Sequence, residues 1–171
     1  MATRTAVNPK WRYNTDDAAR QVALSLNVDT AATYLANGFL RLTSDGDIKE
    51  ATSGAALGVG VDAITHQAIT DRASAPGVTT VYDRFYIITP EDVFEMNEYD
   101  TTIAKTDIGV RCGINVTSNI CTVDISDTTN PQVVLVNPLW AGRDVQDDST
   151  DTLARCYVRV LDTCIDANPD A

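Results

Sequence analysis

The residue types that this sequence favours restrict its secondary structure more than any motif does. Valine, isoleucine and threonine together fill 50 of its 171 positions, and these β-branched side chains favour pleated strands. Of the 24 acidic residues only 4 are glutamate, and lysine occurs only 3 times. Aspartate favours turns and caps, whereas glutamate and lysine are typical of exposed helices. The composition therefore predicts a mainly β protein.

Short segments that suit strands follow one another along the chain, with turn clusters between them. The Asp45-Gly46 pair, for example, suits a tight hairpin turn. Residues 93–99 fit either a strand or one helical turn, with the strand favoured, and residues 101–108 fit a short helix closed by Gly109. The other predicted strands are 21–28, 39–42, 48–51, 57–64, 78–89, 110–116, 120–125, 133–136 and 154–165.

No long helical pattern, internal repeat or composition break divides the chain. We therefore expect an all-β fold, either a single β-barrel or a sandwich of short antiparallel strands, with an extended N-terminal arm. Residues 1–20 are expected to form the arm, residues 21–167 the β-barrel domain and residues 168–171 a C-terminal tail.

The last predicted strand has two distinct faces, because successive side chains of a strand point to opposite sides. Leu153, Arg155, Tyr157 and Arg159 share one face, and the residues between them share the other. The second face is predicted to point inward; its members are Cys156, Val158 and Val160.

The net charge of −11 disfavours direct binding to nucleic acid, since an acidic surface repels phosphates. The charge is unevenly distributed. The first twelve residues hold Arg4, Lys10 and Arg12 and no acid, whereas aspartates crowd the C-terminal end. A basic arm on an acidic body suits docking onto an acidic partner or a second copy of the chain. The alternative is a solvated, frayed end.

The hydropathy pattern predicts no membrane association. The longest apolar runs, such as residues 133–136, are far too short to cross a bilayer. Residues 1–13 lack the apolar block of a signal peptide. We expect a soluble protein that works where it is made, or that is released without ordinary secretion.

A search for catalytic and metal-binding motifs predicts no enzyme, no cofactor and no metal. The single histidine, His66, has Asp62 and Asp71 nearby in sequence, but no nucleophile elbow accompanies them. Neither a phosphate-binding loop nor a complete calcium loop is present. The aspartates of the segment 147–151 could bind a divalent ion weakly, although a solvated loop is favoured.

The four cysteines form no Cys-x-x-Cys pair, which disfavours a zinc ribbon or a redox motif. Cys112 and Cys121 flank a predicted hairpin turn, so a disulfide between them is one reading. Reduced, buried thiols that behave as small apolar side chains are the favoured reading. The state of Cys156 and Cys164 stays open.

Two stretches carry a resemblance to a known family. The segment 36–42 (ANGFLRL) is followed by 45–51 (DGDIKEA) and 56–61 (ALGVGV). This order resembles the small β-barrel decoration, or cement, proteins of tailed-bacteriophage capsids. Residues 103–109 and 123–126 fit the later part of such proteins, where a second hairpin closes the barrel. The pattern covers about half of the chain, and the length, the cysteines and the N-terminal arm depart from it.

The resemblance implies a non-enzymatic virion protein, made in the host cytoplasm and bound to the outer surface of the capsid. It would bridge subunits of the major capsid protein and stabilise the head. It would also associate with itself, as a homotrimer by preference or as a dimer. The arm would extend over a neighbouring subunit, since arginine, tryptophan and tyrosine are typical of interface hot spots. The predicted anchors are Arg4, Lys10, Trp11, Arg12 and Tyr13.

Two other classes of protein remain as alternatives. The first is a carbohydrate- or receptor-binding β-sandwich, such as a viral fibre domain, which requires an aromatic patch; Tyr82, Tyr86 and Trp140 are the available residues. The second is a compact trimeric nucleotide hydrolase, for which no substrate motif is found.

Overall fold

Strands make up almost all of the regular structure. The computed structural model describes residues 6–16, 19–43, 45–51, 64–77, 81–99, 102–137 and 154–162. Apart from one 3₁₀ turn, η1 (Lys105–Asp107), every regular element in these ranges is a β-strand. None of the helical structure in these ranges has the length and apolar character needed to cross a bilayer.

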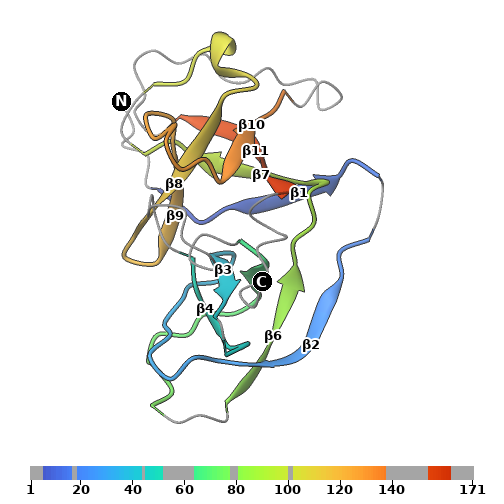
Figure 1. Cartoon of the computed structure of the whole chain (residues 1–171), viewed down its shortest axis with the longest axis vertical. Coiled ribbons are helices and arrows are strands. Elements are labelled where there is room, and N and C mark those ends of the chain that lie inside the picture. Colours follow the sequence, from blue (N-terminus) through green and yellow to red (C-terminus); the bar gives the residue numbers. More distant parts are fainter. Residues whose placement is uncertain are drawn as a thin grey trace.

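The strands form two antiparallel sheets (Figure 1). The six-stranded sheet has the order β1 (Lys10–Asn14), β7 (Asp92–Asn97), β11 (Arg155–Val160), β10 (Val133–Leu135), β8 (Arg111–Thr117) and β9 (Ile120–Asp124). The five-stranded sheet has the order β2 (Val22–Asn27), β6 (Tyr82–Ile87), β5 (His66–Ala68), β3 (Phe39–Leu42) and β4 (Ile48–Glu50). The predicted all-β sandwich is confirmed; the sheets do not close into the alternative barrel.

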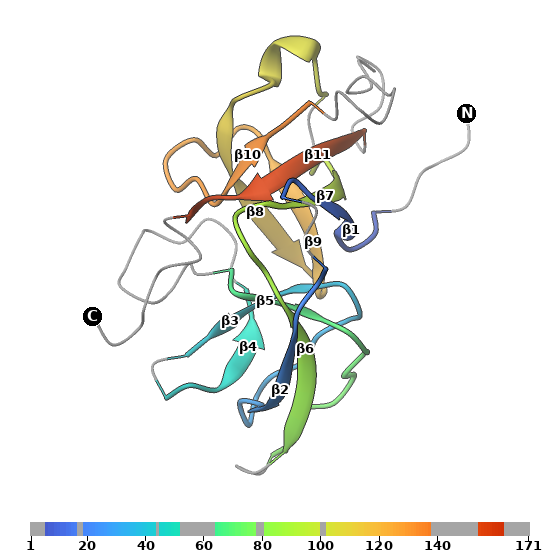
Figure 2. The ribbon, with the colours of Figure 1, turned by 90° about the vertical axis from the view of Figure 1, so that its right-hand side faces the viewer.

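Two strand pairs continue from one sheet into the other as an antiparallel ribbon. β1 pairs with β7 in the six-stranded sheet. β2, which follows β1 in the chain, pairs in the five-stranded sheet with β6, which precedes β7. Between these pairs, the Thr15 N–H donates to the Glu91 carbonyl at 2.9 Å and the Ile87 N–H donates to the Gln21 carbonyl at 3.0 Å. Figure 2 shows the ribbon passing from the upper sheet to the lower one. The main chain itself therefore ties the two sheets together.

Buried side chains form two clusters. The larger cluster takes members from both sheets, and its centre is an edge-to-face pair of Phe39 and Phe94 with ring centroids 5.0 Å apart. The smaller cluster contains Leu40 and Phe85. Phe39 and Leu40 are adjacent in β3, and adjacent strand residues point to opposite faces. The two clusters therefore lie on opposite faces of the five-stranded sheet. Burial of each such aromatic side chain stabilises the fold by about 1.5–3 kcal/mol.

β11 has the predicted faces. The side chains of Cys156, Val158 and Val160 are at most 1% exposed, and Cys156 and Val158 join the larger cluster. Arg155 and Arg159 are on the opposite face and remain open to solvent. The alternation of the sequence was sufficient here because the strand is regular.

The strand predicted at 21–28 is confirmed as β2, but its alternation is interrupted. Val22 is 40% exposed while Ala23 and Val28 are buried. The register of β2 against β6 shifts between Ala23 and Leu26, and Ser25 there has a φ of 50°. Such a bulge moves the following side chains to the other face. The helix expected at 101–108 is reduced to the single turn η1.

Residues 10–14 of the predicted arm are a strand of the six-stranded sheet. β1 forms one edge of this sheet, with Trp11 opposite Phe94 of β7. The proposed separation into arm, domain and tail stays a prediction, since residues 1–5 and the whole tail lie outside the described residues. The predicted strand 57–64 likewise falls there, except for Ile64.

Candidate functional site

The face of the six-stranded sheet that points away from the larger cluster collects basic and aromatic side chains. We call it the outer face. The strand register places Tyr13, Val93, Arg159, Val134 and Arg111 in one row across β1, β7, β11, β10 and β8. Residues directly opposite each other in neighbouring strands share a face. Five strands that are separated in sequence thus contribute to one surface.

A second row of the outer face contains Lys10, Glu95 and Tyr157. Arg12 lies in the register shift of β1, and its guanidinium reaches Glu95. Together the outer face holds 5 of the 13 basic residues of a chain whose net charge is −11. We call these five residues the basic cluster: Lys10, Arg12, Arg111, Arg155 and Arg159.

Glu95 is the centre of this cluster. Its side chain is only 7% exposed and forms ion pairs with Arg12 and Arg155, the latter at 2.6 Å between Nη1 and Oε1. Burial alone raises the pKa of Glu95, but the hydrogen bonds and charges of Arg12 and Arg155 outweigh burial and lower it. Glu95 is therefore ionised at neutral pH and orients two arginines at the surface.

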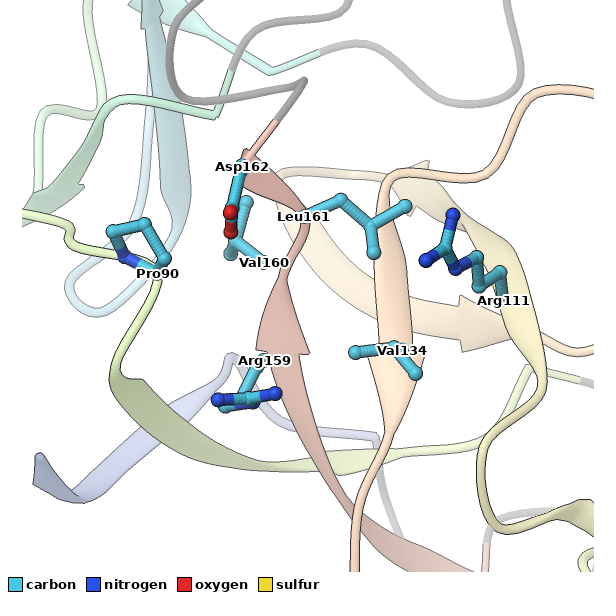
Figure 3. A pocket seen from close by; sticks show the side chains of 7 residues that line it. All are labelled: Pro90, Arg111, Val134, Arg159, Val160, Leu161 and Asp162. Atoms are coloured by element: carbon cyan, nitrogen blue, oxygen red, sulfur yellow. The ribbon is translucent and has the colours of Figure 1, made fainter. Parts of the chain in front are cut away.

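Arg159 and Arg111 line a cavity of about 320 Å³ at the β8–β10–β11 side of the outer face. Figure 3 shows Val134 lying between the two arginines, with Leu161 above it. Arg159 donates from Nη1 to Glu91 Oε2 at 3.3 Å. The cavity thus has two cationic side chains in its walls.

Two tyrosines complete the outer face on the β1 side. Tyr157 is 9% exposed, and Tyr13 is half-buried beside it. Burial and the neighbouring Tyr157 raise the pKa of Tyr13, and Arg159 acts in the opposite direction. The Tyr13 phenol therefore stays neutral, and both tyrosine rings lie next to the arginines.

Trp11 points to the opposite side of β1, toward the core. Its Nε1–H donates to Asp92 at 2.8 Å, and its ring packs against the larger cluster. The guanidinium of Arg20 lies 3.9 Å from the Tyr86 ring centroid and 5.3 Å from that of Trp11. Burial lowers the pKa of Arg20 to about 10, against the effects of Asp92 and Tyr86, so it remains charged. Trp11 and Arg20 fasten the corner between the sheets.

The segment before β1 is bound to its own chain. The Asn8 side chain donates to the carbonyls of Ala36 and Asn119 at 3.2 and 3.1 Å and accepts from the Cys121 N–H at 2.9 Å. The carbonyl of Pro9 accepts from the buried amide of Gln67 at 2.8 Å. Residues 8 and 9 thus connect both sheets.

The predicted anchors therefore separate into two groups. Lys10, Arg12 and Tyr13 lie on the outer face, and Trp11 lies on the core side. Arg4 lies outside the described residues. Their role in an interface stays a prediction. The residues that sequence reasoning did not single out are Arg111, Arg155, Tyr157 and Arg159; the alternation of β11 was the signal for three of them.

His66 is a structural residue of β5. It is 8% exposed, packs edge-on against Phe85, and its Nδ1 lies 2.8 Å from Thr65 Oγ1. Burial lowers its pKa to about 4. Asp71 accepts instead from the Ala36 N–H at 2.6 Å, and Asp62 lies outside the described residues. No group of three possible metal ligands occurs within the described ranges.

Three cysteines are buried and free, as the favoured reading of the sequence had it: Cys112, Cys121 and Cys156. Burial raises the pKa of Cys112 and of Cys121 to about 12. Such thiols are poor nucleophiles. Cys164 lies outside the described residues.

Two of the three aromatic residues considered for sugar binding lie within the described residues, and they differ in exposure. Tyr82 is 62% exposed at the start of β6, whereas Tyr86 is covered by Arg20. Trp140 lies outside the described residues.

Comparisons of the chain with protein families, with curated proteins and with solved structures find no match. The class that the fold and the outer face define is an all-β sandwich with a basic face on an acidic chain.

Proposed function

We propose that this protein is a structural, non-enzymatic accessory protein of a viral capsid, of the decoration type that the sequence resembles. It holds the outer surface of the shell through the outer face of its six-stranded sheet. The observation that carries the proposal is the basic cluster: five cations gathered on one face of a chain with a net charge of −11. Its partner is an acidic surface of the major capsid protein.

The chemistry of the outer face supports protein binding. Arginine and tyrosine dominate interface hot spots because they bury a large area and donate hydrogen bonds. Here they stand on strands, and Glu95 fixes two of the arginines before any partner arrives. Little side-chain freedom is then lost on binding. Opposite charge also speeds encounter and selects the partner.

Stabilisation of a shell follows from linkage. A protein that binds the assembled lattice and not the free subunits shifts the equilibrium toward the lattice. A β-sandwich with one binding face is suited to this task, since binding then needs no conformational change of the protein. The homotrimer predicted from the resemblance stays a prediction, and a light-scattering mass measurement tests it.

The experiment is cosedimentation of the full chain with empty shells of the major capsid protein from the same genome. The double variant Lys10→Gln/Arg155→Gln removes two exposed cations of the basic cluster. Its matched control, Lys49→Gln/Arg84→Gln, removes two cations from the five-stranded sheet. We expect at least tenfold weaker shell binding for the first variant, unchanged binding for the control, and weaker binding of the natural chain at high salt.

Failure of the natural chain to bind shells, or equal losses in both double variants, would overturn the proposal. In that case binding to a glycan array would become the next measurement, since a carbohydrate- or receptor-binding module is the alternative.

A further inference from the structure

The cavity on the outer face differs from the rest of that face because its arginines are not arranged around Glu95. Arg111 and Arg159 stand on its two sides, and Val134, Leu161 and Pro90 supply apolar walls. Its volume of about 320 Å³ is at the lower end of ligand pockets, which span roughly 300–1,000 Å³. The space therefore suits one or two side chains better than a large ligand.

Both arginines have donors to offer. Arg111 is exposed, and no hydrogen bond or ion pair joins it to another described residue. Arg159 donates to Glu91, while its Nε, which is shielded from solvent, has no acceptor. Since each guanidinium carries five N–H donors, the described residues use only a small part of the donor capacity at the cavity.

We infer that this cavity receives the carboxylate side chain of an acidic segment of the partner protein, an inference that rests on the proposed function. The carboxylate lies between Arg111 and Arg159, and the methylene groups of a glutamate pack on Val134 and Leu161. Arginine pairs with carboxylates through two parallel N–H···O bonds, which fixes the orientation of the incoming chain.

Neighbouring acids select for a singly charged group. Asp162 lines the cavity, and Glu91 contacts Arg159 from outside it. Two carboxylates repel a doubly charged phosphate more than a carboxylate, because the repulsion scales with the product of the charges. The occupant is thus a protein carboxylate.

The test is a titration of the full chain, labelled with ¹⁵N-arginine, followed by NMR at the arginine Nε resonances. The probes are a capped pentapeptide Gly-Glu-Gly-Glu-Gly, its Gly-Gln-Gly-Gln-Gly counterpart and inorganic phosphate. We expect saturable shifts of Arg111 and Arg159 with the glutamate peptide and weaker shifts with the other two probes. In Arg111→Gln the remaining Arg159 shift should need at least tenfold more peptide, whereas Arg84→Gln should behave as the natural chain.

Equal shifts with the glutamine peptide, stronger binding of phosphate, or an unchanged titration in Arg111→Gln would overturn the inference. Thermal melting of each variant shows whether it is folded. Shell cosedimentation separates the two proposals: normal shell binding by Arg111→Gln together with loss in Lys10→Gln/Arg155→Gln supports the proposed function and overturns the cavity inference. Saturable peptide binding without shell binding overturns the proposed partner.

Discussion

The two sheets use their charged side chains in opposite ways. In the five-stranded sheet and its loops, two of the described cations each pair with one acid. Arg72 pairs with Asp83 at 3.2 Å, and Lys49 lies 3.8 Å from Asp29. The hydroxyl of Tyr34 joins the first pair, donating to Asp83 and accepting from Arg72. These charges neutralise one another locally.

On the outer face of the six-stranded sheet, the five cations outnumber the acids that the structure describes beside them. Glu91 and Glu95 pair with three of the arginines, and Asp162 lines the cavity. Neutralised pairs contribute to the stability of their own fold, whereas unneutralised charges are available to a partner. The difference supports the proposal that the outer face, rather than the five-stranded sheet, binds the partner.

The largest expected effect comes from deletion of residues 2–14. If these residues were a free arm, their deletion would change the melting temperature little. The structure predicts instead a loss of more than about 4 kcal/mol, since the deletion removes the edge strand β1, the Trp11 side chain from the core and the Asn8 contacts. Urea unfolding measures the loss; a free energy of unfolding within about 1 kcal/mol of that of the whole chain would show that β1 is dispensable.

Acid should weaken the two sheets in different pH ranges. The folded-state pKa of His66 is lowered from 6.5 to about 4, so the unfolded chain binds the proton more readily. Stability is then full above pH 6.5 and decreases by about 3 kcal/mol as the pH falls to 4. His66→Gln should remove most of this slope in urea titrations at several pH values.

Glu95 acts at lower pH. Its folded-state pKa is below the usual 4.5, so its contribution to stability is present above pH 4.5 and is lost as the pH falls through the lowered value.

The His66 prediction has its own contradicting outcome. A His66→Gln variant that kept the full decrease in stability between pH 6.5 and 4 would assign the slope to other groups.

Removal of a single carboxylate from each sheet should have unequal effects. Glu95→Ala leaves Arg12 and Arg155 without their acceptor, and we expect a loss of about 1–3 kcal/mol, discounted for the exposure of Arg155. Asp83→Ala removes the acceptor of Arg72 and should cost about 0.5–1 kcal/mol, because the Asp83 carboxylate is more exposed than that of Glu95. Thermal unfolding of both variants compares them; an equal or larger loss in Asp83→Ala would contradict the central role of Glu95.

A similarly small effect is expected at the corner that both sheets share. Arg20→Lys keeps the charge but loses the flat stacking on Tyr86 and the hydrogen bond of Nη2 to Gln67 at 2.5 Å. We expect a loss of about 1 kcal/mol. Arg84→Lys on the exposed side of β6 is the control, with no measurable change expected.

The local pattern of residue types predicted the buried side chains and the turn correctly where the structure is regular. The alternation of residues 154–165 predicted the inward side chains of β11 correctly, and the Asp45-Gly46 turn has the positive φ, 79° at Gly46, that this pair suits. The strand of residues 21–28 was also predicted, but its bulge at Ser25 was not, because the bulge depends on pairing with β6, which is more than 50 residues away in the chain. The N-terminal residues were interpreted as an arm for the same reason. The partner of β1 is β7, which is also distant in the chain, so no local pattern shows that the two strands pair.

The sequence by itself determined the all-β class, since β-branched residues and turn-forming aspartates leave few helical segments, and it determined which side of β11 is buried. It also supplied the surplus of cations near residue 10. Only the tertiary structure decided that these cations meet Arg111, Arg155 and Arg159 on one face. Strand order and register bring those residues together, and both are set by packing between distant segments rather than by any local preference.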